Sequence, residues 1–99
     1  MRIAVSIVAG LALTACASSV APRVDYHFHL LSPAGAEVLK RQGVEMAPID
    51  GARAVAELDR AGIRRAVILS DAYFFDAPQA VQAENDWTAR EVARFPDRL

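Results

Sequence analysis

The sequence predicts an α/β fold in which parallel strands alternate with helices, and three observations support this. Residues 24–30 alternate between polar and apolar side chains with period two, as in a strand covered on one face. Residues 65–70 contain a continuous apolar run, which is typical of a strand covered on both faces in a parallel sheet. The intervening and following segments carry helix start and stop signals. The expected order is strand, helix, helix, strand, helix.

The first strand has two chemically different faces. The apolar face, which we expect to pack under helices, consists of Val24, Tyr26, Phe28 and Leu30. The opposite face consists of Asp25, His27, His29 and Leu31.

Two helices are predicted between the strands. Ser32 is the expected N-cap of a helix that starts at Pro33 and reaches about Gln42, with Gly43 as a left-handed stop. Residues 44–49 form a loop, and a second helix runs from an Asp50 cap to about residue 61 before Gly62. Its narrow apolar stripe consists of Ala54, Val55, Leu58 and Ala61.

A third helix is predicted after the second strand and the loop at residues 71–75. Asp76 and Gln79 resemble a capping box, and the helix reaches Phe95 before Pro96 ends it. Its apolar face consists of Val81, Thr88, Val92 and Phe95.

Two parallel strands are too few for a stable domain, whereas a closed barrel of eight strand–helix units takes about 250 residues. The chain has 99 residues. We therefore expect residues 24–99 to be the N-terminal portion of a (β/α)8 TIM-like barrel that is incomplete in this chain.

Residues 1–15 are predicted to be an export signal. Arg2 is positively charged, residues 3–13 are apolar but too short to span a bilayer, and small residues follow. Residues 13–16, Leu-Thr-Ala-Cys, resemble the bacterial lipobox, which implies cleavage before Cys16 and its modification by lipid. Residues 16–23 would then be a lipid anchor and flexible tether. The alternatives are a buried N-terminal element with a core cysteine, and a secretory signal cleaved near Ala21.

The expected location is the bacterial cell envelope, lipid-anchored at the membrane. Ala17 after the cysteine, instead of aspartate, resembles lipoproteins sorted to the periplasmic face of the outer membrane. The formal net charge is −1, and the arginines are scattered along the sequence without interleaved aromatic residues. Nucleic acid is therefore not an expected partner.

His27 and His29 are the predicted metal ligands, and they are the only histidines in the chain. Residues two apart on a strand point the same way, with Cα atoms ~6.6 Å apart, so both imidazoles can converge on one ion. They lie at the carboxyl end of the first strand, which carries active sites in parallel barrels. The alternative is a pair of structural histidines that bond a helix end or a backbone carbonyl.

Residues 25–30, Asp-Tyr-His-Phe-His-Leu, resemble the Asp-x-His-x-His signature of the amidohydrolase superfamily, in its amidohydrolase-related (amidohydrolase 2 type) branch. Residues 57–63 leading into 66–70, residues 84–87 and residues 95–99 also resemble that branch. The resemblance implies a metal-dependent hydrolase, or a nonoxidative decarboxylase, that uses a divalent metal, most often zinc, on a small-molecule substrate. It also implies further ligands and a general base from later strands, which this chain does not contain, so we expect this portion alone to be inactive.

Asp71 and Tyr73, after the second strand, are candidate substrate-binding residues, and Asp25 is a candidate for holding a ligand in place. No catalytic residue is identified. Two other functions stay open from sequence: a TatD-like metal-dependent nuclease or phosphoesterase, and a non-catalytic truncated envelope lipoprotein.

Overall fold

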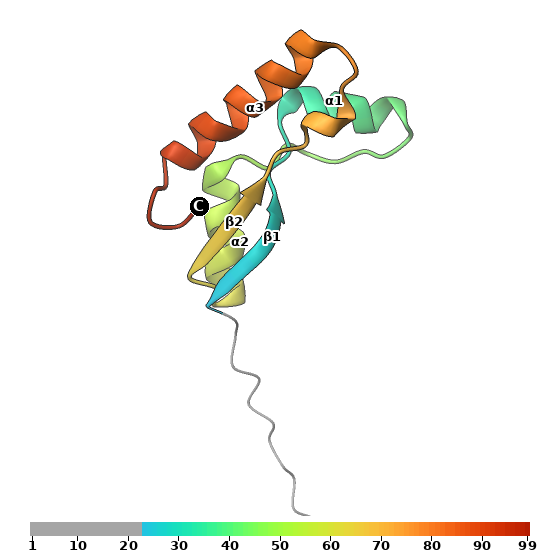
Figure 1. Ribbon diagram of the computed structural model, residues 1–99. Coiled ribbons are helices and arrows are strands. Elements are labelled where there is room, and N and C mark those ends of the chain that lie inside the picture. The colour runs from blue at the N-terminus through green and yellow to red at the C-terminus, as the bar shows by residue number, and fades with distance from the viewer. Residues whose placement is uncertain (1–22) are drawn as a thin grey trace, which may run out of the picture.

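The computed structural model describes residues 23–99 (Figure 1). The predicted signal peptide, Cys16 and the tether up to residue 22 lie outside the described residues. The elements follow in the order β1 (Val24–His29), α1 (Pro33–Arg41), α2 (Gly51–Ala61), β2 (Arg65–Leu69), the short 3-10 helix η1 (Ala72–Phe74) and α3 (Pro78–Ala93). The predicted order of strands and α-helices is confirmed.

β1 and β2 form a parallel two-stranded sheet, in which Val24 pairs with Arg65 and His29 with Leu69. The prediction of a barrel portion is wrong: residues 23–99 form a small mixed α/β unit with one strand pair and three α-helices. Alternation and capping signals specify strands and helices locally, but they do not determine how many strands a sheet has. The segment after α3 instead turns back, and Leu99 is buried in the same core as Ala66.

α2 covers one face of the sheet and contributes Ala54 and Leu58 to the core (Figure 1). Asp50 caps it, accepting a hydrogen bond from the Arg53 N–H at 2.9 Å, and Gly62 ends it with φ of 69°. Both ends therefore agree with the prediction. The core cluster consists of Leu30, Ala54, Leu58, Ala66 and Leu99.

α1 lies between two residues, Leu31 and Ile49, that pair with each other. Ser32 Oγ accepts a hydrogen bond from Gly35 N–H at 2.9 Å, which confirms the predicted N-cap. Leu31 and Ile49 then form an isolated antiparallel bridge, with N–H to carbonyl distances of 3.0 Å and 2.8 Å. This bridge returns the chain to the start of α2.

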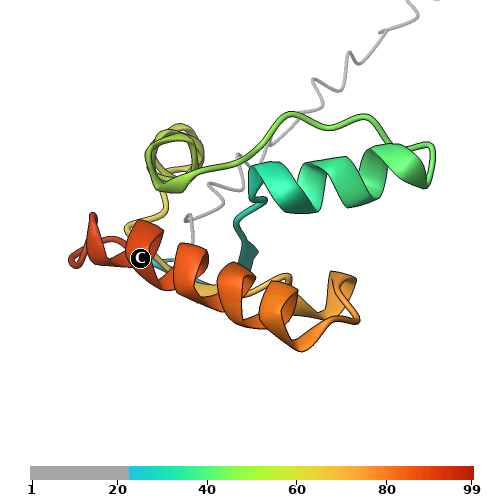
Figure 2. The ribbon, with the colours of Figure 1, turned by 90° about the horizontal axis from the view of Figure 1, so that it is seen from above.

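α3 runs past both α2 and α1 (Figure 2). Its N-cap is Ala77, with no side-chain cap, so the predicted capping box of Asp76 and Gln79 is wrong. Pro78 explains the difference, because proline fits the first helical position and thereby places Asp76 one residue outside the cap. The helix also ends two residues earlier than predicted, at Ala93.

The predicted burial of the strands is wrong at two positions. Tyr26, expected beneath the helices, is 75% exposed, and Val67 on β2 is 46% exposed. Val67 is exposed because the helices leave the second face of this two-stranded sheet open. In β1 the strict alternation is interrupted by a register shift between Asp25 and Phe28, where three steps along β1 match two along β2.

Within residues 23–99, no helix is both long and apolar enough to cross a membrane.

Candidate functional site

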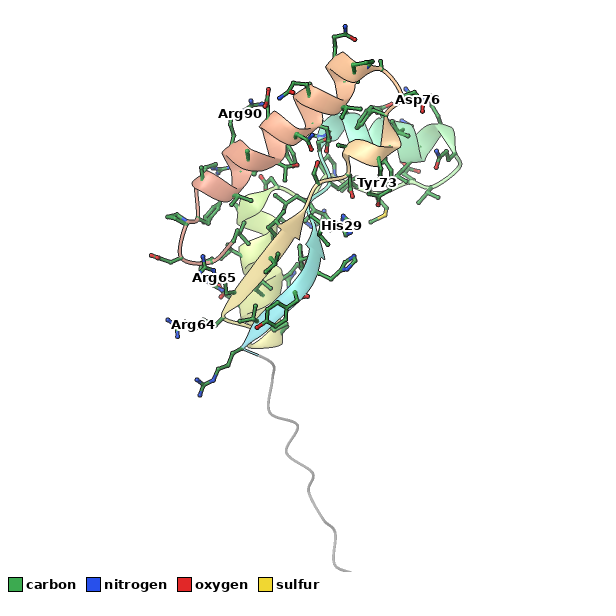
Figure 3. All side chains as sticks on the ribbon, viewed as in Figure 1. His29, Arg64, Arg65, Tyr73, Asp76 and Arg90 are labelled. Atoms are coloured by element: carbon green, nitrogen blue, oxygen red, sulfur yellow. The ribbon has the colours of Figure 1, made fainter. Side chains whose placement is uncertain are left out.

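The predicted site residues come together at the carboxyl end of the strand pair. Because β1 and β2 are parallel, their carboxyl ends lie at the same edge of the sheet. His29 pairs with Leu69 in the ladder, and Asp71 follows Leu69 by two residues. Figure 3 shows His29 at this edge with Tyr73 beside it. The fold therefore brings two segments about forty residues apart into one site.

The two imidazoles converge as the spacing predicts. Nε2 of His27 lies 3.1 Å from Nε2 of His29, and the ring centroids are 5.0 Å apart at an interplanar angle of 54°. His27 is exposed and His29 is half-buried. The paired nitrogens thus lie at the surface, where an ion or a small molecule can reach them.

Asp71 contacts the opposite side of the His29 ring. Its buried Oδ1 lies 2.6 Å from Nδ1 of His29. The ring N–H is not directed at the oxygen, so the contact is electrostatic without being an aligned hydrogen bond, and neither atom has another partner among the described residues. With Nδ1 facing the carboxylate, Nε2 is the ring nitrogen of His29 that faces His27.

The register shift in β1 sets the direction of both histidines. Asp25 aligns with Ala66, while Phe28 aligns with Ile68 and packs against the core. His27 and His29 flank Phe28 and therefore face away from the core. Asp25 does not hold either imidazole: its Oδ1 accepts a hydrogen bond from the backbone N–H of His27 at 2.9 Å, and so stabilises the shift.

Tyr73 forms the outer border of the site. Its ring meets that of His29 edge-on, with centroids 6.3 Å apart, and 70% of the residue is exposed. Desolvation of the phenol and then the Asp71 carboxylate raise the pKa of Tyr73, which keeps the hydroxyl a hydrogen-bond donor. Substrate contact by Asp71 and Tyr73 stays a prediction.

His27 and His29 can provide two of the ligands that a divalent metal ion needs. A tetrahedral zinc ion at ~2.0–2.1 Å from its nitrogens keeps them ~3.3 Å apart, close to the 3.1 Å between His27 and His29. A carboxylate on the other ring nitrogen, as Asp71 provides, is the usual companion of a metal-ligating histidine. Within residues 23–99, however, no group of three histidine, cysteine or acidic side chains is arranged to hold an ion.

Comparisons with protein-family models, curated proteins and solved structures find no match for this chain.

Two polar contacts of the fold were not predicted from the sequence. The first is the contact of Asp71 with His29, which could have been anticipated because Asp71 follows the strand that pairs with β1. The second is a buried pair near the start of α1, where Ser32 Oγ donates to Glu84 Oε2 at 2.6 Å. No local signal marked Glu84, since its partner lies 52 residues away.

Proposed function

We propose that the protein binds a divalent metal ion, zinc in the first instance, through Nε2 of His27 and His29. We further propose that the ion serves a metal-dependent hydrolase acting on a small molecule, with nonoxidative decarboxylation as the alternative reaction. The observation that carries the proposal is the 3.1 Å convergence of the two Nε2 atoms, with Asp71 against Nδ1 of His29.

The three side chains have separable roles in this proposal. His27 and His29 bind, and Asp71 keeps a proton on Nδ1 of His29 so that Nε2 stays free to act as a ligand. When bound, the ion lowers the pKa of water and supplies a nucleophile near neutral pH. Tyr73, with its raised pKa and exposed position, is placed to donate a hydrogen bond to a substrate oxygen.

The direct experiment measures metal in the purified protein. We expect about one equivalent of zinc or cobalt after loading and dialysis, with cobalt giving the visible spectrum of a low-coordinate site. His27→Gln keeps a polar side chain of similar length and should lose the ion, whereas the control Tyr26→Phe on the same strand should retain it. Equal metal content in the wild type and His27→Gln would contradict the proposal.

The reaction class is tested separately on the loaded protein in its longest natural form, because residues 23–99 alone provide two ligands and are expected to be inactive. Release of nitrophenol from a chromogenic ester reports hydrolysis, and release of carbon dioxide from an aromatic acid reports decarboxylation. Each activity should disappear in His27→Gln and persist in Tyr26→Phe. Metal binding without either activity would support the proposed metal site and contradict the proposed enzymatic activity.

A second candidate is a non-catalytic envelope protein in which His27 and His29 simply bond to each other. The distance of 3.1 Å is also that of a nitrogen–nitrogen hydrogen bond, and the described residues offer only two ligands. This candidate predicts no metal uptake. It also predicts that His27→Gln leaves metal content unchanged and affects only thermal stability.

The proposed location is the periplasmic face of a bacterial outer membrane, with lipid on Cys16. It is supported by the apolar run before Cys16 and by the small residues around it. Radioactive palmitate should label the wild type and not Cys16→Ser. Absence of label from the wild type would contradict the attachment.

A further inference from the structure

A cluster of arginines lies at the end of the sheet opposite the histidines. Figure 3 shows Arg64 and Arg65 at the amino end of the strand pair and His29 at the carboxyl end. A cavity of about 560 Å³ opens here, and its lining consists of Arg23, Val24, Arg64, Arg65, Asp97 and Arg98. We call Arg23, Arg64, Arg65 and Arg98 the arginine cluster.

Backbone hydrogen bonds hold three members of the arginine cluster together. The carbonyl of Arg23 accepts from the N–H groups of Arg64 and Arg65, both at 3.2 Å. This arrangement joins the start of β1 to the start of β2, so the three side chains leave the fold from neighbouring positions. Their proximity is therefore fixed by the sheet and needs no ligand to assemble it.

The charges of the arginine cluster are only partly compensated. Arg98 is neutralised, because its Nη2 lies 2.6 Å from Oδ1 of Asp59 while its Nε donates to the Arg64 carbonyl at 2.7 Å. Arg65 makes a long hydrogen bond, 3.3 Å, to the carbonyl of Pro96. Among residues 23–99, Arg23, Arg64 and Arg65 form no ion pair with a carboxylate.

The arginine cluster is also close along the chain to the proposed lipid. Six residues separate Cys16 from Arg23, and even a fully extended chain of this length reaches only ~25 Å. A lipid on Cys16 would thus hold these guanidinium groups near the bilayer surface. Lipid attachment and a basic patch are two signals that together give stable membrane anchoring.

We infer that the arginine cluster docks on the anionic phospholipid surface of the membrane, an inference that rests on the proposed lipid attachment at Cys16. Phosphate headgroups accept paired hydrogen bonds from guanidinium groups, and their charge complements the three uncompensated arginines. Since His29 lies at the carboxyl end of β1 and the arginine cluster at its amino end, docking leaves the histidine pair away from the bilayer surface, open to soluble molecules.

Vesicle binding tests the inference apart from the lipid. Full-chain protein carrying Cys16→Ser is mixed with vesicles of phosphatidylcholine alone or of phosphatidylcholine with phosphatidylglycerol, and the bound fraction is measured by sedimentation. We expect tighter binding to the anionic vesicles. Removing two charges with Arg64→Gln and Arg65→Gln should lower the anionic partition coefficient roughly 30-fold, about fivefold per charge.

A matched control removes two charges elsewhere. Arg41 and Arg90 are exposed on α1 and α3, and Figure 3 shows Arg90 well away from Arg64 and Arg65. Arg41→Gln with Arg90→Gln should leave anionic binding nearly unchanged. Arg64→Lys with Arg65→Lys should largely restore it. Circular dichroism melts of all variants separate loss of binding from loss of fold.

Three results would overturn the inference: equal binding to both vesicle types, equal loss in the control variant, or displacement by inorganic phosphate at constant ionic strength. The last result would indicate a discrete phosphate site in the cavity. The lipid attachment is judged independently by the mass of the wild-type protein. Binding to anionic vesicles without a lipid mass on the wild type would support the docking surface and contradict the lipid attachment. A lipid mass without binding to anionic vesicles would support the lipid attachment and contradict the docking surface.

Discussion

Nδ1 of His29 lies 2.6 Å from the Asp71 carboxylate, on the side of the ring opposite the nitrogen that faces His27. The imidazole is thus placed between a buried negative charge and a second imidazole. A metal-ligating histidine usually has a carboxylate against its other ring nitrogen, as His29 has here. The contact also links the end of β1 to the segment that follows β2.

Asp71→Asn should lower the affinity for zinc by roughly 10–100-fold, because the amide no longer favours the ligand form of His29. Calorimetric titration with zinc measures the change. Asp76→Asn removes the same charge from an exposed position in the loop before α3 and should leave the affinity unchanged. Equal affinities of the two variants would mean that Asp71 does not support the ligand.

The same substitution should change the titration of Tyr73. Desolvation and then the Asp71 carboxylate raise the pKa of this phenol, because a negative neighbour disfavours the phenolate. Removing the negative charge with Asp71→Asn should therefore move ionisation to lower pH. Ultraviolet absorbance of the phenolate reports it in a Tyr26→Phe background, where Tyr73 is the only tyrosine. An unchanged titration would show that Asp71 does not act on Tyr73.

Ser32→Ala should cost roughly 2–4 kcal/mol of the free energy of unfolding, since it removes an N-cap and leaves Glu84 Oε2 buried without its donor. Asp50→Ala removes a cap of the same kind at an exposed position, and should cost about 1 kcal/mol. Urea denaturation of both variants gives the comparison. Similar losses would indicate that the contact of Ser32 with Glu84 contributes little.

Gly51→Ala should destabilise the protein by about 1–3 kcal/mol. A Cβ at this position would lie 2.9 Å from the Phe95 ring and 3.0 Å from the Glu91 carbonyl, so α2 and α3 would have to move apart. The move would also stretch the 2.9 Å hydrogen bond from Gly51 N–H to Glu91 Oε2. Thermal or urea unfolding measures the cost, with Ala52→Ser at the exposed neighbouring position expected within about 0.5 kcal/mol.

Local signals predicted the elements of this fold well. Ser32 and Asp50 cap the helices that follow them, and Gly43 and Gly62 take up positive φ values of 85° and 69°. Caps and left-handed stops involve atoms three or four residues apart, so the sequence carries them directly. Asp76 is the exception. It was predicted to cap α3, but Pro78 determines where that helix begins.

Features that depend on pairing between distant segments were not predictable in this way. The interrupted alternation of β1 exists only relative to β2, and the exposure of Val67 depends on which face the helices cover. The convergence of His27 and His29 was predicted because it depends on spacing alone. The position of Asp71 near the histidines followed from the predicted parallel strands, whereas its contact with Nδ1 of His29 depends on the side-chain arrangement of the folded chain.

Because β1 contains a one-residue register shift, deletion of one residue there should disturb the direction of the histidines less than a regular pairing of the full segment would. Loss of Tyr26 would remove the extra residue, so that strict alternation from Asp25 would still carry both imidazoles to the open face. A regular ladder that kept all residues would instead turn the histidines inward and Phe28 outward. Variants of this protein that shorten the segment by one residue can therefore retain the histidine pair.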